Sequence, residues 1–143
     1  MPDVTITFRW RRHPGGRRTA ALRSLAATAL DRLGVGPVEL GVLVCDDATI
    51  RTLNRHFRGR DEATDVLSFP AGFEQPGGPP YLGDVAISLE TARRQAERIG
   101  APIGTELATL LLHAVVHLAG FDHETDTGQM AAVEARLRRE LIP

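Results

Sequence analysis

The stretch TELATLLLHAVVHLAG, which runs from Thr105 to Gly120, decides how the rest of the chain must be arranged. We interpret it as a strongly apolar helix, and a helix that is apolar on most sides belongs in a protein core. Glycine is the usual residue for ending a helix in a left-handed conformation, so the helix is expected to stop near Gly120. The sequence therefore predicts a central, buried helix.

The segments around this helix predict four strands and four further helices. The strands are expected at residues 3–10, 38–45, 64–70 and 82–88, and the helices at 17–34, 46–59, 89–100 and 125–142. In the second of these helices, Ile50, Leu53 and Phe57 form an apolar stripe. Because no repeat, linker or domain boundary is visible, we expect residues 1–143 to form a single α+β domain of about four strands and about five helices.

The composition is typical of a globular protein without a membrane segment. The chain has 143 residues, of which 43% are hydrophobic and 24% charged. No apolar run approaches the roughly 20 residues that cross a bilayer, and the N-terminal sequence lacks the apolar stretch of a secretion signal. The only cysteine, Cys45, is expected to be a small buried hydrophobe in a reducing compartment. These features predict a cytoplasmic protein.

The distribution of charge is more informative than the net charge of −1, which gives no argument for an anionic partner. The chain has no lysine, so all 17 of its Lys and Arg residues are arginines. The block Arg9 to Arg18 holds five arginines and the block Arg51 to Arg60 holds four, and neither contains an acidic residue. Each block alone is typical of a solvated surface. Phosphate binding is expected only if one of them faces a reactive site.

Three of the five histidines lie between His113 and His123. His113 and His117 are four residues apart on the predicted helix, so their side chains leave the same face and could bind one metal ion. A turn at Gly120 would bring His123 towards the same point. Three imidazoles with one open position describe a catalytic zinc site, since structural zinc sites normally have four protein ligands. Hydrogen-bonded core histidines, the alternative, would not explain a third histidine directly after a helix-ending glycine.

The spacing H-x-x-x-H-x-x-G-x-x-H also occurs in the metzincin proteases, whose second position is a glutamate that activates metal-bound water. That position is Ala114 here, and alanine cannot accept a proton. The sequence therefore argues against a protease of this type. Glu106 lies two turns earlier on about the same face, and we interpret it as an acidic residue that suits a helix N-terminus.

With these residues the chain resembles the YbeY family of bacterial endoribonucleases, also called ribosomal RNA maturation factors. The family signature H-G-x-L-H-L-x-G-Y-D-H corresponds to HAVVHLAGFDH at residues 113–123. A second block, L-N-x-x-[YF]-R-x-x-D-x-x-T-D-V-L-S-F-P, is matched throughout at residues 53–70, and a third, L-G-D-[IV]-x-I-S, at residues 82–88. Ala114 and Phe121 replace the usual glycine and tyrosine, and neither is a proposed ligand.

The resemblance implies a mixed sheet covered by helices and a zinc ion held by His113, His117 and His123. It further implies hydrolysis of single-stranded RNA. In the family this activity is linked to ribosomal RNA processing, particularly of the small ribosomal subunit, and to ribosome quality control. Arg58 aligns with a family arginine thought to matter for activity.

Our hypothesis is metal-assisted cleavage of a phosphodiester bond. Zinc would lower the pKa of a bound water and polarise a phosphoryl oxygen, and the planar guanidinium of Arg58 would offset the charge that develops on the phosphate. No general base is identified. Asp122 could orient a ligand histidine or occupy a turn, and Asp84 could face inward or end a turn. The sequence assigns no role to Asn54 or Asp65 within the matched block.

Two other functions stay open. The histidine spacing also suits a metal-dependent hydrolase of another substrate, such as a peptide, although Ala114 argues against it. The chain could instead be a non-catalytic ribosome-binding factor with structural zinc. Having only three clear ligands argues against that alternative, because a structural site needs a fourth and Cys45 lies far away in sequence.

Overall fold

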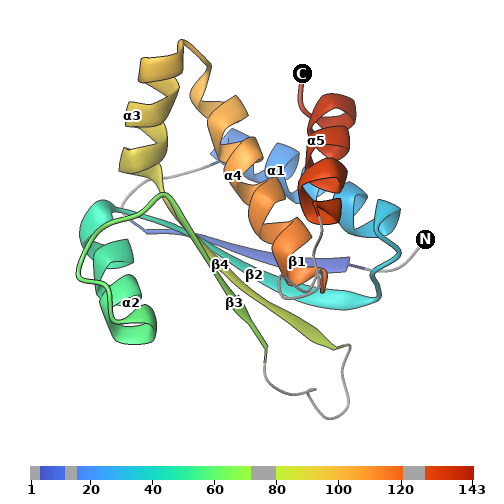
Figure 1. Ribbon diagram of the computed structural model, residues 1–143, viewed down its shortest axis with the longest axis horizontal. Coiled ribbons are helices and arrows are strands. Elements are labelled where there is room, and N and C mark those ends of the chain that lie inside the picture. The colour runs from blue at the N-terminus through green and yellow to red at the C-terminus, as the bar shows by residue number, and fades with distance from the viewer. Residues whose placement is uncertain (1–3, 12–15, 72–79, 121–127) are drawn as a thin grey trace.

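The computed structural model describes residues 4–11, 16–71, 80–120 and 128–143. Its elements in chain order are β1 (Val4–Trp10), α1 (Gly16–Arg32), β2 (Val38–Cys45), α2 (Asp47–Arg58), β3 (Val66–Pro70), β4 (Tyr81–Ser88), α3 (Leu89–Ile99), α4 (Ile103–Leu118) and α5 (Gln129–Leu141). The predicted α+β fold of four strands and five helices is confirmed for the described ranges (Figure 1).

The strands form one mixed sheet in the order β1-β2-β4-β3. β1 pairs with β2 and β2 pairs with β4 in parallel, and helices connect these parallel strands as such pairings require. β3 runs antiparallel to β4 at the edge of the sheet. Among the described residues, no strand pairs with the outer side of β3.

Helix α4 is the centre of the main core, as predicted. It packs across β3 and β4, with α1 and α5 beside it on the same side of the sheet (Figure 1). Leu107, Leu111 and Val115 of α4 are fully buried together with Val44 of β2. Helix α2 covers part of the other face through a smaller apolar cluster of Cys45, Ile50, Leu67 and Ala86. The sheet thus separates two apolar layers.

Local hydrogen bonds explain where α2 and α3 begin and end. The Oδ1 atom of Asp46 accepts a bond of 2.8 Å from the Thr49 amide, and Gly59, with φ of 71°, ends the helix. Ser88 Oγ accepts a bond of 3.2 Å from the Thr91 amide at the start of α3. Short polar side chains satisfy the free amides of a first turn, and glycine adopts the left-handed conformation at low cost.

Two details differ from the sequence-based expectation. Helix α4 begins at Ile103, two residues before the predicted start. It follows Pro102, which has no N–H group and a fixed φ, so proline suits the start of a helix but not its interior. In α2 the predicted apolar stripe is only partly correct, since Ile50 is buried but Phe57 is 61% exposed. The last turn of α2 borders an open cavity, where the Phe57 ring contacts Phe69 at a centroid distance of 5.1 Å.

Helices α3 and α4 meet at a sharp bend of 116°. Across the described ranges, no single helix combines the length and the apolar character that crossing a bilayer requires, and only this bent pair does so jointly. The apolar side chains of α4 are buried against the sheet.

The close approach of β3, β4 and α4 at Gly83 generates a test of the fold. A Cβ atom at this residue, whose φ is 153°, would collide with the Phe69 carbonyl oxygen and lie 3.1 Å from Leu118 Cδ2. We expect Gly83→Ala to lower the free energy of unfolding by roughly 1–3 kcal/mol in a urea titration. Gly104→Ala is the control, because nothing lies within 4 Å of its Cβ position, and it should be neutral or slightly stabilising. Equal stability of the two variants would contradict the collision.

Candidate metal centre

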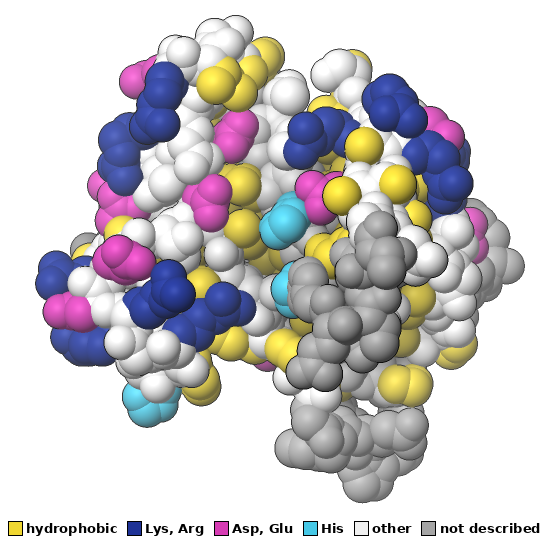
Figure 2. Space-filling view, in the orientation of Figure 1, with side chains coloured by type: hydrophobic (Ala, Val, Ile, Leu, Met, Phe, Trp, Pro, Cys, Tyr) yellow, Lys and Arg dark blue, Asp and Glu magenta, His cyan; other side chains and the backbone are white. Residues whose placement is uncertain are grey.

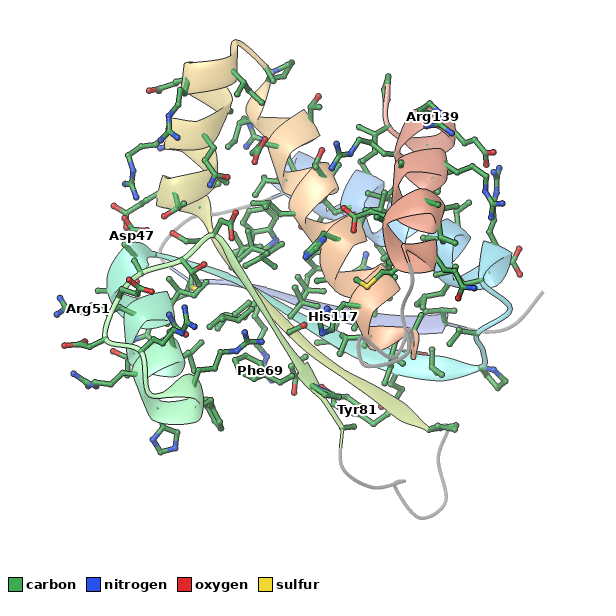
Figure 3. All side chains as sticks on the ribbon, viewed as in Figure 1. Asp47, Arg51, Phe69, Tyr81, His117 and Arg139 are labelled. Carbon is green, nitrogen blue, oxygen red and sulfur yellow. The ribbon has the colours of Figure 1, made fainter. Side chains whose placement is uncertain are left out.

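His113 and His117 lie one turn apart on the side of α4 that is not buried in the core. The His113 side chain is 50% exposed and His117 is partly exposed. Their ring centroids are 6.4 Å apart. Figure 2 shows histidine side chains in a hollow over α4, and Figure 3 places His117 near the end of that helix over the sheet. The structure therefore brings together two of the three histidines that the sequence singled out.

The donor set of this pair fits a zinc ion. Imidazole nitrogens are preferred zinc ligands, and two histidines four residues apart on a helix can share one ion. His113 Nδ1 lies 2.7 Å from Glu134 Oε1, so the ring is already oriented by a carboxylate. His123 and Asp122 lie outside the described residues. Within the described ranges no three His, Cys, Asp or Glu side chains are arranged to hold a metal ion. The three-histidine site stays a prediction.

Charged side chains of α4, of α5 and of the segment just before β3 lie near one another. Glu134 of α5 also lies 3.6 Å from Arg138 Nη2. Burial raises the pKa of the Glu106 carboxyl, the negative charge of Asp65 raises it further, and Arg138 acts in the opposite direction. Glu106 is only 9% exposed. Its interpretation as an acid that suits a helix N-terminus is therefore incomplete, because burial makes its ionisation costly.

The structure gives Asp65 and Asn54 the roles that the sequence left unassigned. Asp65 Oδ2 accepts a bond of 3.2 Å from Gln95 Nε2, and its backbone oxygen accepts one of 2.9 Å from the Ser88 amide. These bonds join the start of β3 to α3 and β4. The buried Asn54 donates from Nδ2 to the backbone oxygen of Glu62 at 2.9 Å. Both residues fix the connection between α2 and β3.

Arg58, the predicted catalytic cation, stands at the outer edge of β3. Its Nη2 atom donates a bond of 3.4 Å to the backbone oxygen of Ser68. The antiparallel pairing with β4 uses the Asp65 oxygen and the Ala71 amide, so the Ser68 carbonyl points away from β4. Arg58 thus bonds to the backbone of β3, whereas His113 bonds to Glu134 of α5. Its catalytic role stays a prediction.

The other arginines of the block Arg51 to Arg60 are paired with acidic residues just beyond it. Arg51 Nε lies 2.8 Å and Arg55 Nη1 3.9 Å from Asp61 Oδ1, and Arg60 Nη1 lies 3.9 Å from Glu62 Oε1. These exposed pairs add little stability. They do reduce the free positive charge around α2, so only Arg58 of this block lacks an ion pair within the described ranges.

A cavity of about 930 Å³ opens on the other face of the sheet, and neither histidine lines it. Arg58, Phe69, Tyr81 and Asp84 are among its lining residues. Asp84 lies within β4, so the expectation that it ends a turn was wrong; its exposed side chain borders the cavity and accepts a hydrogen bond from the Tyr81 hydroxyl. We place the candidate chemistry on the α4 side, because imidazoles and carboxylates meet there.

Cys45 is buried on the face of the sheet that α2 covers. Its Sγ atom donates to the backbone oxygen of Ile87 at 3.5 Å. Burial raises the pKa of the Cys45 thiol to about 12, so the thiolate form that binds metals is suppressed. The expectation of a small buried hydrophobe is confirmed. Cys45 is therefore unsuited to supply a fourth ligand to the histidines of α4.

Comparison with known proteins identifies the family. The family model described as endoribonuclease YbeY matches residues 16–141. The chain belongs to the endoribonuclease YbeY family. The endoribonuclease YbeY of Anaeromyxobacter sp. (strain Fw109-5) is 49% identical over 130 residues, which cover 89% of this chain and 67% of that protein. The YbeY protein of Solibacter usitatus is 44% identical over 137 residues, covering 96% of this chain and 87% of that protein.

A solved structure supports the fold independently of these sequences. The solution structure of TM1509 from Thermotoga maritima has a TM-score of 0.68 with this chain at 24% identity. The match covers 96% of this chain and 89% of TM1509. The YbeY resemblance and the mixed α+β fold are both confirmed.

Glu134 is the residue of this site that sequence reasoning missed. It lies outside the three matched blocks and 21 residues after His113. One signal was present, because Glu134 follows Met130 by four positions and precedes Leu137 by three, and both of these are buried. A carboxylate on the buried stripe of a helix needs a polar partner. The sequence alone does not say which residue provides it.

The raised pKa of Glu106 predicts a pH-dependent stability. A carboxyl whose pKa is raised by folding loses stability as pH rises through that pKa, so the ionised group destabilises the fold at neutral pH. Glu106→Gln should therefore be more stable than the parent protein at pH 7.5. The difference should shrink towards pH 4, where the carboxyl is mostly protonated in both states. Urea titrations at both pH values test this. Glu97→Gln, at an exposed position of α3, should show no such gain.

Proposed function

We propose that this chain is a zinc-dependent endoribonuclease that cleaves single-stranded RNA. The observation that carries the proposal is the pair His113 and His117 on the open side of α4, in a chain of the endoribonuclease YbeY family. One zinc ion would be held by these two residues and His123. Residues 1–143 would act as a single metallo-endoribonuclease domain.

The proposed reaction is hydrolysis of a phosphodiester bond. Zinc in this site would supply Lewis acidity, which lowers the pKa of water towards neutrality and polarises a phosphoryl oxygen. His113 and His117 would contribute two imidazole ligands from a helix whose other sides are buried, so the backbone that carries them is held in place by the core. Glu134 holds the His113 ring through the bond to Nδ1.

Arg58 is the proposed catalytic cation. Its guanidinium has no ion pair within the described ranges and is held at the edge of β3 only through the Ser68 carbonyl. A planar guanidinium can bind two oxygens of a phosphate and offset the charge that develops during cleavage. In the part of the chain that the structure describes, Arg51, Arg55 and Arg60 are paired with acidic residues and Arg58 is not, which favours this role.

The proposed biological role is ribosomal RNA processing in the cytoplasm, particularly maturation of small-subunit RNA, with a part in ribosome quality control. The small ribosomal subunit would then be the partner. The support is family membership, since the relatives are named endoribonuclease YbeY. No described helix is able to cross a bilayer by itself, which agrees with this role.

The competing functions are less well supported. A peptide hydrolase of the metzincin type needs a proton acceptor at residue 114, and Ala114 is buried in the core. A ribosome-binding factor with structural zinc needs a fourth ligand, and Cys45 is held in the apolar layer on the other face of the sheet.

The first experiment compares the parent protein with His117→Ala at matched purity. The parent should contain about one zinc per chain and cut a labelled single-stranded RNA, and the variant should do neither. Metal analysis and gel electrophoresis of the RNA provide the two readouts. Equal cleavage by both samples would assign the activity to a contaminating nuclease. Zinc content without cleavage in the parent would favour the ribosome-binding factor.

Removing the guanidinium of Arg58 separates catalysis from metal binding. Arg58→Ala should retain zinc but lose about 10²- to 10³-fold in cleavage rate, the usual effect of removing one group that stabilises developing charge. Single-turnover cleavage at several salt concentrations measures this. Arg93→Ala removes an exposed arginine of α3 and should change the rate little. Full activity of Arg58→Ala with unchanged zinc would remove this residue from the mechanism.

A further inference from the structure

Glu134 occupies an unusual place on α5. The helix turns Met130 and Leu137 into the core, and Glu134 lies on the same stripe between them. Its side chain is only 15% exposed. A carboxylate withdrawn from water to this degree requires compensating hydrogen bonds. The structure supplies these from α4 and from the next turn of α5.

The two oxygens of this carboxylate have different partners. Oε1 lies 2.7 Å from His113 Nδ1, a short distance for a nitrogen donor and an oxygen acceptor. Oε2 lies 3.6 Å from Arg138 Nη2. Arg138 therefore pairs with one oxygen and leaves the other to the imidazole. The His113 ring is held between its own helix and a neighbouring helix.

The direction of this hydrogen bond fixes the chemistry of the imidazole. When the Glu134 carboxylate is ionised it can only accept, and the hydrogen of this bond is then on Nδ1 of His113. In a neutral imidazole the lone pair is then on Nε2. A metal ligand needs that lone pair. In many proteins the other ring nitrogen of a metal-binding histidine donates its hydrogen to a carboxylate, which orients the ring.

We propose that Glu134 is a positioning residue of the metal centre, which holds His113 in the Nδ1–H tautomer and presents Nε2 to the metal ion. The inference rests on the proposed role of His113 as a ligand. It adds a residue from α5, outside the three sequence blocks, to the determinants of metal affinity. Glu134 does not itself touch the metal in this arrangement, because its near oxygen is engaged by Nδ1.

The experiment measures zinc affinity by competition with a chromophoric chelator. Glu134→Ala should bind zinc about 10- to 100-fold more weakly than the parent, the usual effect of removing such a carboxylate. Arg138→Ala is the matched control, since it removes the other partner of Glu134 and leaves the bond to His113. Its zinc affinity should match that of the parent. Thermal denaturation of each metal-free variant establishes that it is folded.

A spectroscopic readout separates positioning from general structural support. Nitrogen-15 spectra of the metal-free parent, at a pH where the imidazoles are neutral, should show His113 as the Nδ1–H tautomer. Glu134→Gln should show a mixture, because an amide can either accept from Nδ1 or donate to it. Should Glu134→Ala fail to fold, Glu134→Gln carries the test, and its zinc affinity should still fall.

The outcomes distinguish this inference from the proposed function. If His113→Ala weakens zinc binding but Glu134→Ala and Glu134→Gln bind as the parent does, the positioning role is wrong and the metal site stands. If the parent binds no zinc, or His113→Ala binds it equally well, both are wrong. A pure Nδ1–H tautomer in Glu134→Gln with parental affinity would also overturn the role of the carboxylate.

Discussion

The packing of α4 on β3 and β4 is the constraint on which the rest of this structure depends. Leu107, Leu111 and Val115 are fully buried, and each such side chain contributes about 1.5–3 kcal/mol of burial free energy. Rotating the helix about its axis would expose these residues, so the direction in which its remaining side faces is fixed as well. That side carries His113 and His117. The hydrophobic core therefore determines where two imidazoles point, and the helices α1, α3 and α5 pack around the same element.

The charged residues beside α4 show how a core helix can carry polar chemistry. Glu106 and Glu134 are both largely buried, and each lies near Arg138. The cation offsets part of the cost of two withdrawn carboxylates. Glu134 has the additional bond to His113, whereas the charge of Asp65 raises the pKa of Glu106. Similar side chains thus have different properties because their neighbours come from different elements.

The edge strand β3 connects the two sides of the sheet. Its start is held through Asp65 by bonds to α3 and β4, and its outer backbone is contacted by Arg58 from α2. One face beside it carries α4 and the histidines, and the other carries the cavity lined by Phe69. Pairing of the nearby arginines with Asp61 and Glu62 leaves Arg58 distinct among them. Among the described residues, Arg58 is the arginine of this block that contacts the backbone of β3.

The sequence by itself determined the order of elements, the buried helix and the pairing of His113 with His117, because these follow from local periodicity and from caps such as Asp46 and Gly59. The motif blocks also determined the family. Only the tertiary structure decided that Glu134 meets His113 and that Arg58 stands at an outer strand edge. Both contacts join separate elements across 21 and 10 residues of chain. Their formation depends on how helices and strands pack, and no local pattern encodes that geometry.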